Sequence, residues 1–94
     1  MRFEKDFILR NSRGLHARPA SLFVQMALTF ESEINVHNLD SEMAADGKSV
    51  LSMLMLAAPC GTRIRITATG DDAENAISAL STLVDQGFDD DDNE

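Results

Sequence analysis

The chain of 94 residues contains no tryptophan, no tyrosine and only one cysteine. A single cysteine cannot form an internal disulfide bond, which fits a reducing compartment, and we expect Cys60 to lie in a loop. The only two histidines are His16 and His37, and no Cys-x-x-Cys or His-x-x-x-His spacing occurs. Because zinc sites use such spacings, the sequence predicts no metal site.

Long apolar runs are also missing. The longest, from Leu54 to Pro59 after Met53, is far shorter than the roughly 20 residues that a membrane-spanning helix needs. The first residues, Met1 to Asp6, lack the apolar stretch of a secretory signal. We therefore expect no membrane insertion and a cytoplasmic location.

Basic residues are scarce, with 8 lysines and arginines against 16 aspartates and glutamates, for a net charge of -8. The lack of a basic stripe, of tryptophan and of tyrosine disfavours nucleic-acid binding. Much of the acidic excess lies at the C-terminus, without any base between the acids: Asp85, Asp89, Asp90, Asp91, Asp92 and Glu94. We expect residues 1–88 to form one small domain and residues 89–94 an acidic, disordered tail, whose plainest role is to promote solubility.

Near the N-terminus the sequence contains a strong helix-start signal. Pro19 has a fixed φ and no N–H group, which fits the first turn of a helix and fits badly further in. We therefore predict a helix that begins near Ala17. The apolar residues that follow have the spacing of an amphipathic helix about three turns long: Ala20, Phe23, Val24, Ala27 and Leu28.

This prediction places His16 at or just before the helix N-terminus. The backbone N–H groups of Ala17 and Arg18 then point outward beside the imidazole, and the helix dipole adds roughly half a positive charge. A phosphoryl group on the ring would accept hydrogen bonds from these amides and from the Arg18 guanidinium, while Gly14 allows a tight preceding turn. Other bases expected near the site are Arg10, Arg13 and Lys48. The alternative is that His16 is a helix N-cap or a surface residue without a task.

Periodicity elsewhere predicts four strands and two further helices. The strands are expected near residues 3–9, 34–36, 43–45 and 63–68, the last with a clear alternation of polar and apolar residues. Asp71 and Asp72 are expected to supply an N-cap for the last helix. Its apolar positions are Ala73, Ala76, Ile77, Leu80, Leu83 and Val84. The order βαββαβα indicates an α+β domain.

The middle helix, expected over residues 50–58, is apolar around most of its circumference. We expect three of its residues to face the sheet: Met53, Leu56 and Ala57. Three others are then left on the opposite side: Val50, Leu51 and Leu54. An exposed aliphatic patch indicates a docking surface, and the alternative is that the whole helix is buried in the core.

The string Gly14-Leu15-His16-Ala17-Arg18-Pro19-Ala20 is identical to the active-site motif of HPr, the histidine-containing phosphocarrier of the bacterial phosphoenolpyruvate-dependent phosphotransferase system. The resemblance to the HPr/NPr family covers nearly everything from Arg2 to Phe88. It implies an open-faced β-sandwich, in which three helices cover one face of a four-stranded antiparallel sheet. It also implies phosphorylation of His16 on Nδ1, charge stabilisation by Arg18 and the Ala17 amide, and partner docking through the middle helix.

Ser49 follows Gly47 and Lys48 at the start of the middle helix, in register with a serine that a dedicated kinase phosphorylates in many HPr proteins. The resemblance therefore implies a regulatory phosphorylation site, and with it a kinase and phosphatase as partners. As sequence alone, Ser49 is an ordinary helix N-cap. The two roles are compatible.

The function that follows is that of a monomeric phosphocarrier without cofactors. It accepts a phosphoryl group on His16 from enzyme I and passes it to a downstream acceptor domain in sugar uptake or regulation. It is a covalent carrier rather than an enzyme, because its partners supply most of the catalysis. The alternative is a regulatory binding module that is read out through phosphorylation of Ser49 or His16, including a nitrogen-related phosphotransferase branch.

Overall fold

The computed structural model describes residues 1–89, and its elements follow the predicted order. They are β1 (Arg2–Ile8), α1 (Ala17–Ala27), β2 (Glu33–Asn38), β3 (Met43–Asp46), α2 (Val50–Leu54), β4 (Arg63–Thr69) and α3 (Ala73–Asp85), followed by a short 3-10 helix, η1 (Gly87–Asp89). The acidic tail was predicted to be disordered over residues 89–94: Asp89 is the last residue of η1, and residues 90–94 lie outside the described part of the chain. No helix within residues 1–89 is long and apolar enough to cross a membrane.

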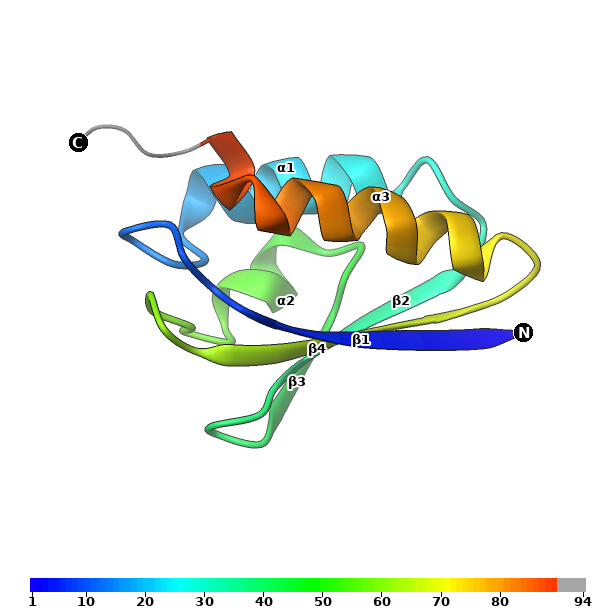
Figure 1. The fold of residues 1–94 in the computed structure, drawn as a ribbon. Coiled ribbons are helices and arrows are strands. Elements are labelled where there is room, and N and C mark those ends of the chain that lie inside the picture. The colour runs from blue at the N-terminus through cyan, green and yellow to red at the C-terminus, as the bar shows by residue number, and fades with distance from the viewer. Residues whose placement is uncertain (90–94) are drawn as a thin grey trace.

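The four strands form one antiparallel sheet in the order β1-β4-β2-β3. The register pairs Phe7 with Ile64 and Val36 with Ile66, so apolar residues of neighbouring strands lie side by side. Figure 1 shows all three α-helices on one side of this sheet, with the other side left open. The α+β, open-faced β-sandwich prediction is therefore confirmed.

Alternation along β4 decides which face is buried. Ile64, Ile66 and Ala68 are at most 1% exposed and face the helices. Arg63 and Arg65 lie on the other face. There they form ion pairs with Asp40 and Asp6, at 3.0 and 2.7 Å between the nearest nitrogen and oxygen atoms. Residues two apart along a strand share a face, so this pattern alone positions the sheet against its helices.

The helix α1 buries the predicted apolar stripe except for its last member. Four of the five predicted residues are at most 5% exposed: Ala20, Phe23, Val24 and Ala27. Leu28 is 60% exposed, so the prediction for this residue is wrong. The helix ends at Ala27 and Leu28 is its C-cap, after which the chain leaves toward β2. The part of the stripe that reaches the core therefore ends with Ala27, the last residue of the helix.

The helix α2 is shorter than predicted. It ends at Leu54, and the next turn tightens through bonds from the Ala57 N–H to the Leu54 carbonyl and from the Leu56 N–H to the Met53 carbonyl. Met53 and Leu56 are buried as expected. Ala57 is exposed, against the prediction, because its backbone adopts a left-handed conformation with φ of 48° that turns the chain out of the helix.

Ala58, rather than Ala57, is the residue that enters the core after this turn, at 4% exposed. The helical spacing that placed Ala57 against the sheet does not continue past Leu54. The left-handed residue changes the direction of the chain, so the side chain one position later points inward.

Asp72 is the N-cap residue of α3, as predicted, but its side chain makes no capping bond. Its carboxylate instead accepts hydrogen bonds from the backbone N–H groups of Glu31 and Ser32, both at 2.9 Å, and from the Ser32 hydroxyl. The bonds from Ser32 and Glu31 lower the pKa of the Asp72 carboxyl from its ordinary value. Asp72 thus connects α3 to the loop that follows α1.

Candidate functional site at the start of α1

His16 occupies the N-cap position of α1, with an extended backbone (φ −85°, ψ −170°). Its carbonyl accepts the first helical hydrogen bond, from the Ala20 N–H at 3.0 Å. The N–H groups of Ala17 and Arg18 belong to the first helical turn, where no preceding helical carbonyl exists to accept them. His16 is half-buried, while Ala17 and Arg18 are exposed. The structure therefore places the imidazole and two backbone donors at one helix end, with the exposed Arg18 in the first helical turn.

The simple alternative, that His16 serves as a capping side chain, is not what the structure contains. The His16 side chain makes no cap hydrogen bond to α1. Residues that are selected for capping, such as Ser49 at the start of α2, accept a bond from a backbone N–H of the first turn. His16 therefore occupies the N-cap position without acting as a side-chain cap.

The tight turn before His16 requires a glycine. Gly14 has a φ of 65°, and a Cβ atom on it would lie 2.1 Å from the carbonyl oxygen of Ala58. The next residue, Leu15, is buried and donates its N–H to that same carbonyl at 2.9 Å. The loop before α1 is therefore packed directly on the α2–β4 loop (residues 55–62), and any side chain at position 14 would force them apart.

A shallow hollow lies beside the imidazole between these two loops. Its volume is ≈ 240 Å³, so it suits a small group rather than a large ligand. Its lining comes from the two loops: Arg13, Leu15, His16, Ala57, Ala58 and Pro59.

The hollow is small in absolute terms, since ligand pockets usually enclose roughly 300–1,000 Å³. A phosphoryl group and the tip of a partner's side chain are of the size that it admits.

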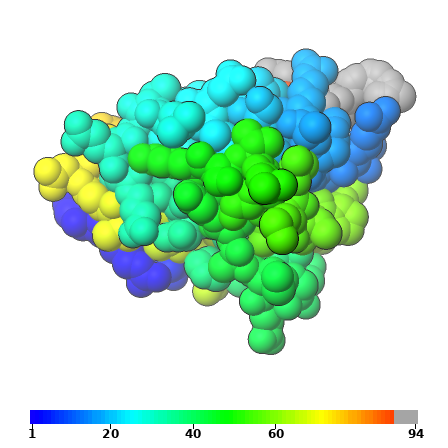
Figure 2. Space-filling view, turned by 180° about the vertical axis from the view of Figure 1, so that it is seen from behind, coloured from blue at the N-terminus to red at the C-terminus, as the bar shows by residue number. Residues whose placement is uncertain are grey.

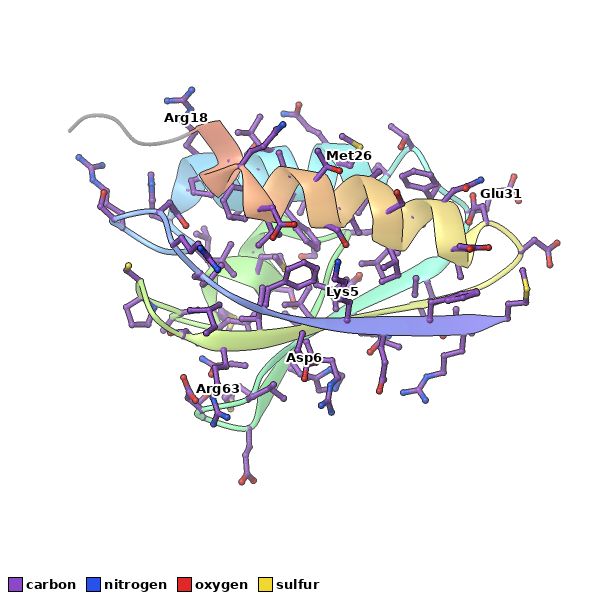
Figure 3. All side chains as sticks on the ribbon, viewed as in Figure 1. Lys5, Asp6, Arg18, Met26, Glu31 and Arg63 are labelled. Atoms are coloured by element: carbon purple, nitrogen blue, oxygen red, sulfur yellow. The ribbon has the colours of Figure 1, made fainter. Side chains whose placement is uncertain are left out.

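The predicted cations divide into two groups in the structure. Arg18 lies on the outer side of α1 at its N-terminal end (Figure 3), and Arg13 lines the hollow beside His16. Lys48 does not belong to the site, against the prediction, because its Nζ donates to the Phe30 carbonyl at 2.8 Å, beyond the far end of α1. Arg10 lies in the loop before α1, where its carbonyl accepts a weak bond from the Cys60 thiol at 3.8 Å.

The outer surface of α2 carries an apolar patch, which we define as Leu51, Leu54 and Met55. They are 70%, 36% and 69% exposed. In Figure 2 the side chains of α2 form the central part of one face of the molecule, next to α1. Since Ala57, just after this helix, lines the hollow beside His16, the patch and the histidine share one side of the fold.

Two details of this patch differ from the prediction. Val50 is half-buried and packs against the core, because it lies one turn before the fully buried Met53 on the same side of α2. Met55 is exposed and was missed, because the sequence pattern assumed that the helix continues through it. The exposed position at the start of α2 is therefore Leu51 alone.

Ser49 is the N-cap of α2, as the simpler interpretation predicted. Its hydroxyl oxygen accepts a hydrogen bond from the Ser52 N–H at 3.1 Å. The Ser52 hydroxyl in turn accepts from the Asp46 N–H at 2.8 Å, and the Asp46 carboxylate accepts from the Lys48 N–H. The segment before α2 is thus a connected network of short-range bonds, with Ser49 half-buried within it.

Within residues 1–89, no group of three or more histidine, cysteine, aspartate or glutamate side chains is placed to hold a metal ion. Cys60 is exposed in the α2–β4 loop, which confirms its predicted place.

Comparison with known proteins explains this arrangement. Residues 3–86 match the family model described as "PTS HPr component phosphorylation site". The chain belongs to the HPr/NPr family of phosphocarrier proteins. The phosphocarrier protein NPr of Proteus mirabilis is 39% identical over 83 residues, which cover 88% of this chain and 91% of that protein.

Solved HPr structures share the fold as well as the sequence. HPr-C-His from Thermoanaerobacter tengcongensis is 37% identical, with a TM-score of 0.88 over 95% of this chain and 98% of that chain. The multiphosphoryl transfer protein of Salmonella typhimurium is 40% identical over 84 residues, but the chain spans only 22% of its length. An HPr-like unit therefore occurs both by itself and as one part of a larger relative.

Sequence reasoning missed one buried residue that belongs to the structure of this HPr site. Asn11 is 1% exposed, and its side-chain Nδ2 donates to the Gly14 carbonyl at 2.6 Å. The spacing of an asparagine three residues before a glycine is typical of a turn and could have indicated it.

Proposed function

We propose that this HPr-family chain carries a phosphoryl group on His16, which it receives from phosphorylated enzyme I and passes to a downstream acceptor domain. The observation that carries the proposal is the position of His16 at the N-cap of α1, where its side chain makes no capping bond and Arg18 lies in the first helical turn. A helix N-terminus binds anions through its backbone N–H groups and dipole, and a guanidinium adds a second, fork-shaped donor.

The transfer step requires little chemistry from the chain itself. The neutral His16 imidazole attacks the phosphorus atom of the phosphorylated donor through Nδ1, the atom that the family resemblance implies. The new nitrogen–phosphorus bond forms as the bond to the donor breaks, and the donor keeps that electron pair. The Ala17 and Arg18 amides and the Arg18 guanidinium offset the negative charge of the transferring group. Transfer to the acceptor reverses these steps.

Partner proteins are proposed to dock on the apolar patch on α2, with Val50 at its edge. The exposed Leu51, Leu54 and Met55 side chains offer an aliphatic surface on the same side of the fold as His16. Enzyme I and the acceptor domains would then use one surface in turn, which suits a monomeric carrier in the cytoplasm. Such a carrier needs no cofactor and is not itself an enzyme, because each transfer is completed with the partner's residues.

Ser49 gives a second, regulatory function. Its N-cap position places the hydroxyl next to Val50 and the apolar patch. A phosphate there would add about -1.5 to -2 charges at the edge of the docking surface and would alter which partners bind. This supports the alternative of a regulatory module, in which the acceptor is a regulatory domain of a sugar-related or nitrogen-related phosphotransferase branch, and a kinase and phosphatase act on Ser49.

The test is the mass of the chain after incubation with phosphoenolpyruvate, magnesium and enzyme I from the same organism. We expect the gain of one phosphoryl group, labile in acid and absent from the His16→Ala variant. An Arg18→Ala variant should gain the group more slowly. An unchanged mass, with enzyme I shown to be phosphorylated itself, would refute the carrier proposal for this pair.

Ser49 is tested separately with a Ser49→Asp variant, which adds a negative charge at the same position. Slower phosphorylation of this variant by enzyme I, with Ser49→Ala unaffected, supports the regulatory function. Equal rates for both variants contradict it.

A further inference from the structure

The loop before His16 contains a buried side chain that binds the backbone directly before the histidine. Asn11 is 1% exposed, so it cannot touch a phosphoryl group or a partner. Its Nδ2 donates to the Gly14 carbonyl oxygen at 2.6 Å, and the Gly14 N–H donates back to the Asn11 carbonyl at 3.0 Å. The two residues therefore close a turn through both side chain and backbone.

This turn fixes one particular peptide unit, the one that joins Gly14 to Leu15. Its carbonyl accepts from the Asn11 side chain, and its N–H donates to the Ala58 carbonyl at 2.9 Å. A peptide unit that is bonded at both its C=O and its N–H cannot rotate without breaking both bonds. The same Gly14 carbonyl also accepts from the His16 N–H at 3.1 Å.

We propose that Asn11 is a positioning residue for phosphoryl transfer, acting through the Gly14–Leu15 peptide to set the backbone of His16. This inference rests on the proposed function of His16. The helix start fixes the imidazole from the C-terminal side, since the His16 carbonyl accepts from the Ala20 N–H. The Asn11 bond fixes it from the N-terminal side. Both are needed, because a displacement of about 1 Å at a reacting group is enough to cost roughly a hundredfold in rate.

The donor on Asn11 is the feature that this role requires. An aspartate has the same shape and can close the same turn, but its ionised carboxylate has no N–H to donate and would face the Gly14 carbonyl with like charge. Asn11→Asp therefore removes the hydrogen bond with little change in side-chain volume. Asn11→Ala removes the hydrogen bond and most of the side chain. A role in stability alone would predict the same transfer rate in any variant that is still folded.

The experiment measures phosphoryl transfer from phosphorylated enzyme I to the wild-type chain, to Asn11→Asp and to Asn11→Ala. We expect the limiting rate constant to fall about tenfold in both variants. The half-saturating concentration of the chain should stay unchanged, because the apolar patch lies outside the turn. A matched control is Ile34→Val, which removes a methylene from a fully buried residue of β2. It should lose stability but transfer at the wild-type rate.

A second measurement does not depend on any partner. In nuclear magnetic resonance spectra of the unphosphorylated chain, both Asn11 variants should shift the imidazole resonances of His16 and the amide resonances of Ala17 and Arg18. Ile34→Val should leave these unchanged. If a variant fails to fold, its spectrum shows this directly and the other variant is compared.

Two results would overturn the inference: a wild-type limiting rate in a folded Asn11 variant, or His16 resonances that do not move. If the wild-type chain itself accepts no phosphoryl group, the proposed function fails instead. In that case the spectra still decide whether Asn11 positions His16.

Discussion

The two ends of α1 use charged side chains in opposite ways. At the C-terminal end, Asp72 and Lys48 bind backbone groups of residues 30–32. At the N-terminal end, the loop is held by backbone hydrogen bonds and one buried asparagine, and Arg18 is exposed. Figure 3 shows Arg18 and Glu31 at these opposite ends. Charged side chains therefore contribute to the structure at the C-terminal end of α1. At the N-terminal end, the charge of Arg18 stays available to an anion.

This difference between the two ends of α1 shows how a small domain keeps the end that contains His16 accessible and still well ordered. Neutral backbone bonds between the loop before α1 and the α2–β4 loop hold the segment that precedes His16. Mutations at the two ends should therefore separate stability from phosphoryl transfer.

The largest effect is expected from Gly14→Ala, which should destabilise the fold by about 3 kcal/mol and abolish phosphorylation. The added Cβ would meet the Ala58 carbonyl at 2.1 Å, at a φ of 65° that alanine avoids. Urea unfolding measures the loss. The control is Gly61→Ala, which shares a positive φ of 92° but has no heavy atom within 4 Å of the new Cβ, so it should cost about 1 kcal/mol. Equal losses for both would contradict the role of the loop–loop contact.

At the opposite end, Asp72→Asn should lower the melting temperature but leave the rate of phosphoryl transfer unchanged. It removes the charge that accepts bonds from Glu31 and Ser32. Asp71→Asn, at the exposed neighbouring position, is the matched control and should change neither quantity. A slower transfer in Asp72→Asn would show that the two ends of α1 are coupled.

The pH dependence of stability gives a further test of Asp72, through a comparison of the wild type with Asp72→Asn. The pKa of Asp72 is lowered in the folded state from 3.8, so the stability it contributes is fully present above that pH and is lost as the pH falls through the lowered value. The difference in unfolding free energy between the wild type and Asp72→Asn should therefore be constant near neutral pH and shrink below about pH 3.8. Urea unfolding at several pH values measures it, and a difference that grows on acidification has the wrong sign.

A stabilising change is expected in the α2–β4 loop. Ala57 has a φ of 48°, which costs an alanine about 1 kcal/mol relative to glycine. Ala57→Gly should raise the unfolding free energy by somewhat less than that, because glycine is more flexible in the unfolded chain. Thermal unfolding checks the sign. Ala44→Gly, in strand β3 without a positive φ, should destabilise instead.

The smallest effect on stability is expected from a substitution in the apolar patch. Leu51 is 70% exposed, so Leu51→Ser should change the unfolding free energy by no more than about 0.5 kcal/mol. It should raise the half-saturating concentration of the chain for enzyme I and leave the limiting rate unchanged, which is the reverse of the Asn11 pattern. An unchanged half-saturating concentration would remove Leu51 from the docking surface.

Local signals predicted much of this molecule. The alternation of β4 and the start of α1 at Ala17 follow from neighbouring residues alone, so the pattern, Pro19 and Gly14 indicated them correctly. The motif around His16 indicated the family correctly, because it too is a run of consecutive residues. The arrangement of strands in space came from the family resemblance, since periodicity does not determine which strands pair.

The errors occurred where contacts from distant segments decide. Lys48 was expected near His16 but bonds to the Phe30 carbonyl, 18 residues away in sequence. Asp72 was expected to cap its own helix but binds residues 40 and 41 positions earlier. No spacing rule connects such distant partners. Val50 is a different case: it was placed on the outer face, although it lies one helical turn before the buried Met53 on the same side of α2.

The pairing of β1 with β4 has a consequence for synthesis of the chain. The first strand finds its partner in residues 63–69, and Leu15 finds its carbonyl partner at Ala58. On a ribosome, the segment around His16 therefore emerges long before the residues that shape it. A nascent chain contains the histidine early, but the folded surroundings of His16 form only after more than half of the sequence has been translated. A phosphoryl donor therefore meets a competent carrier only after most of the chain has emerged from the ribosome.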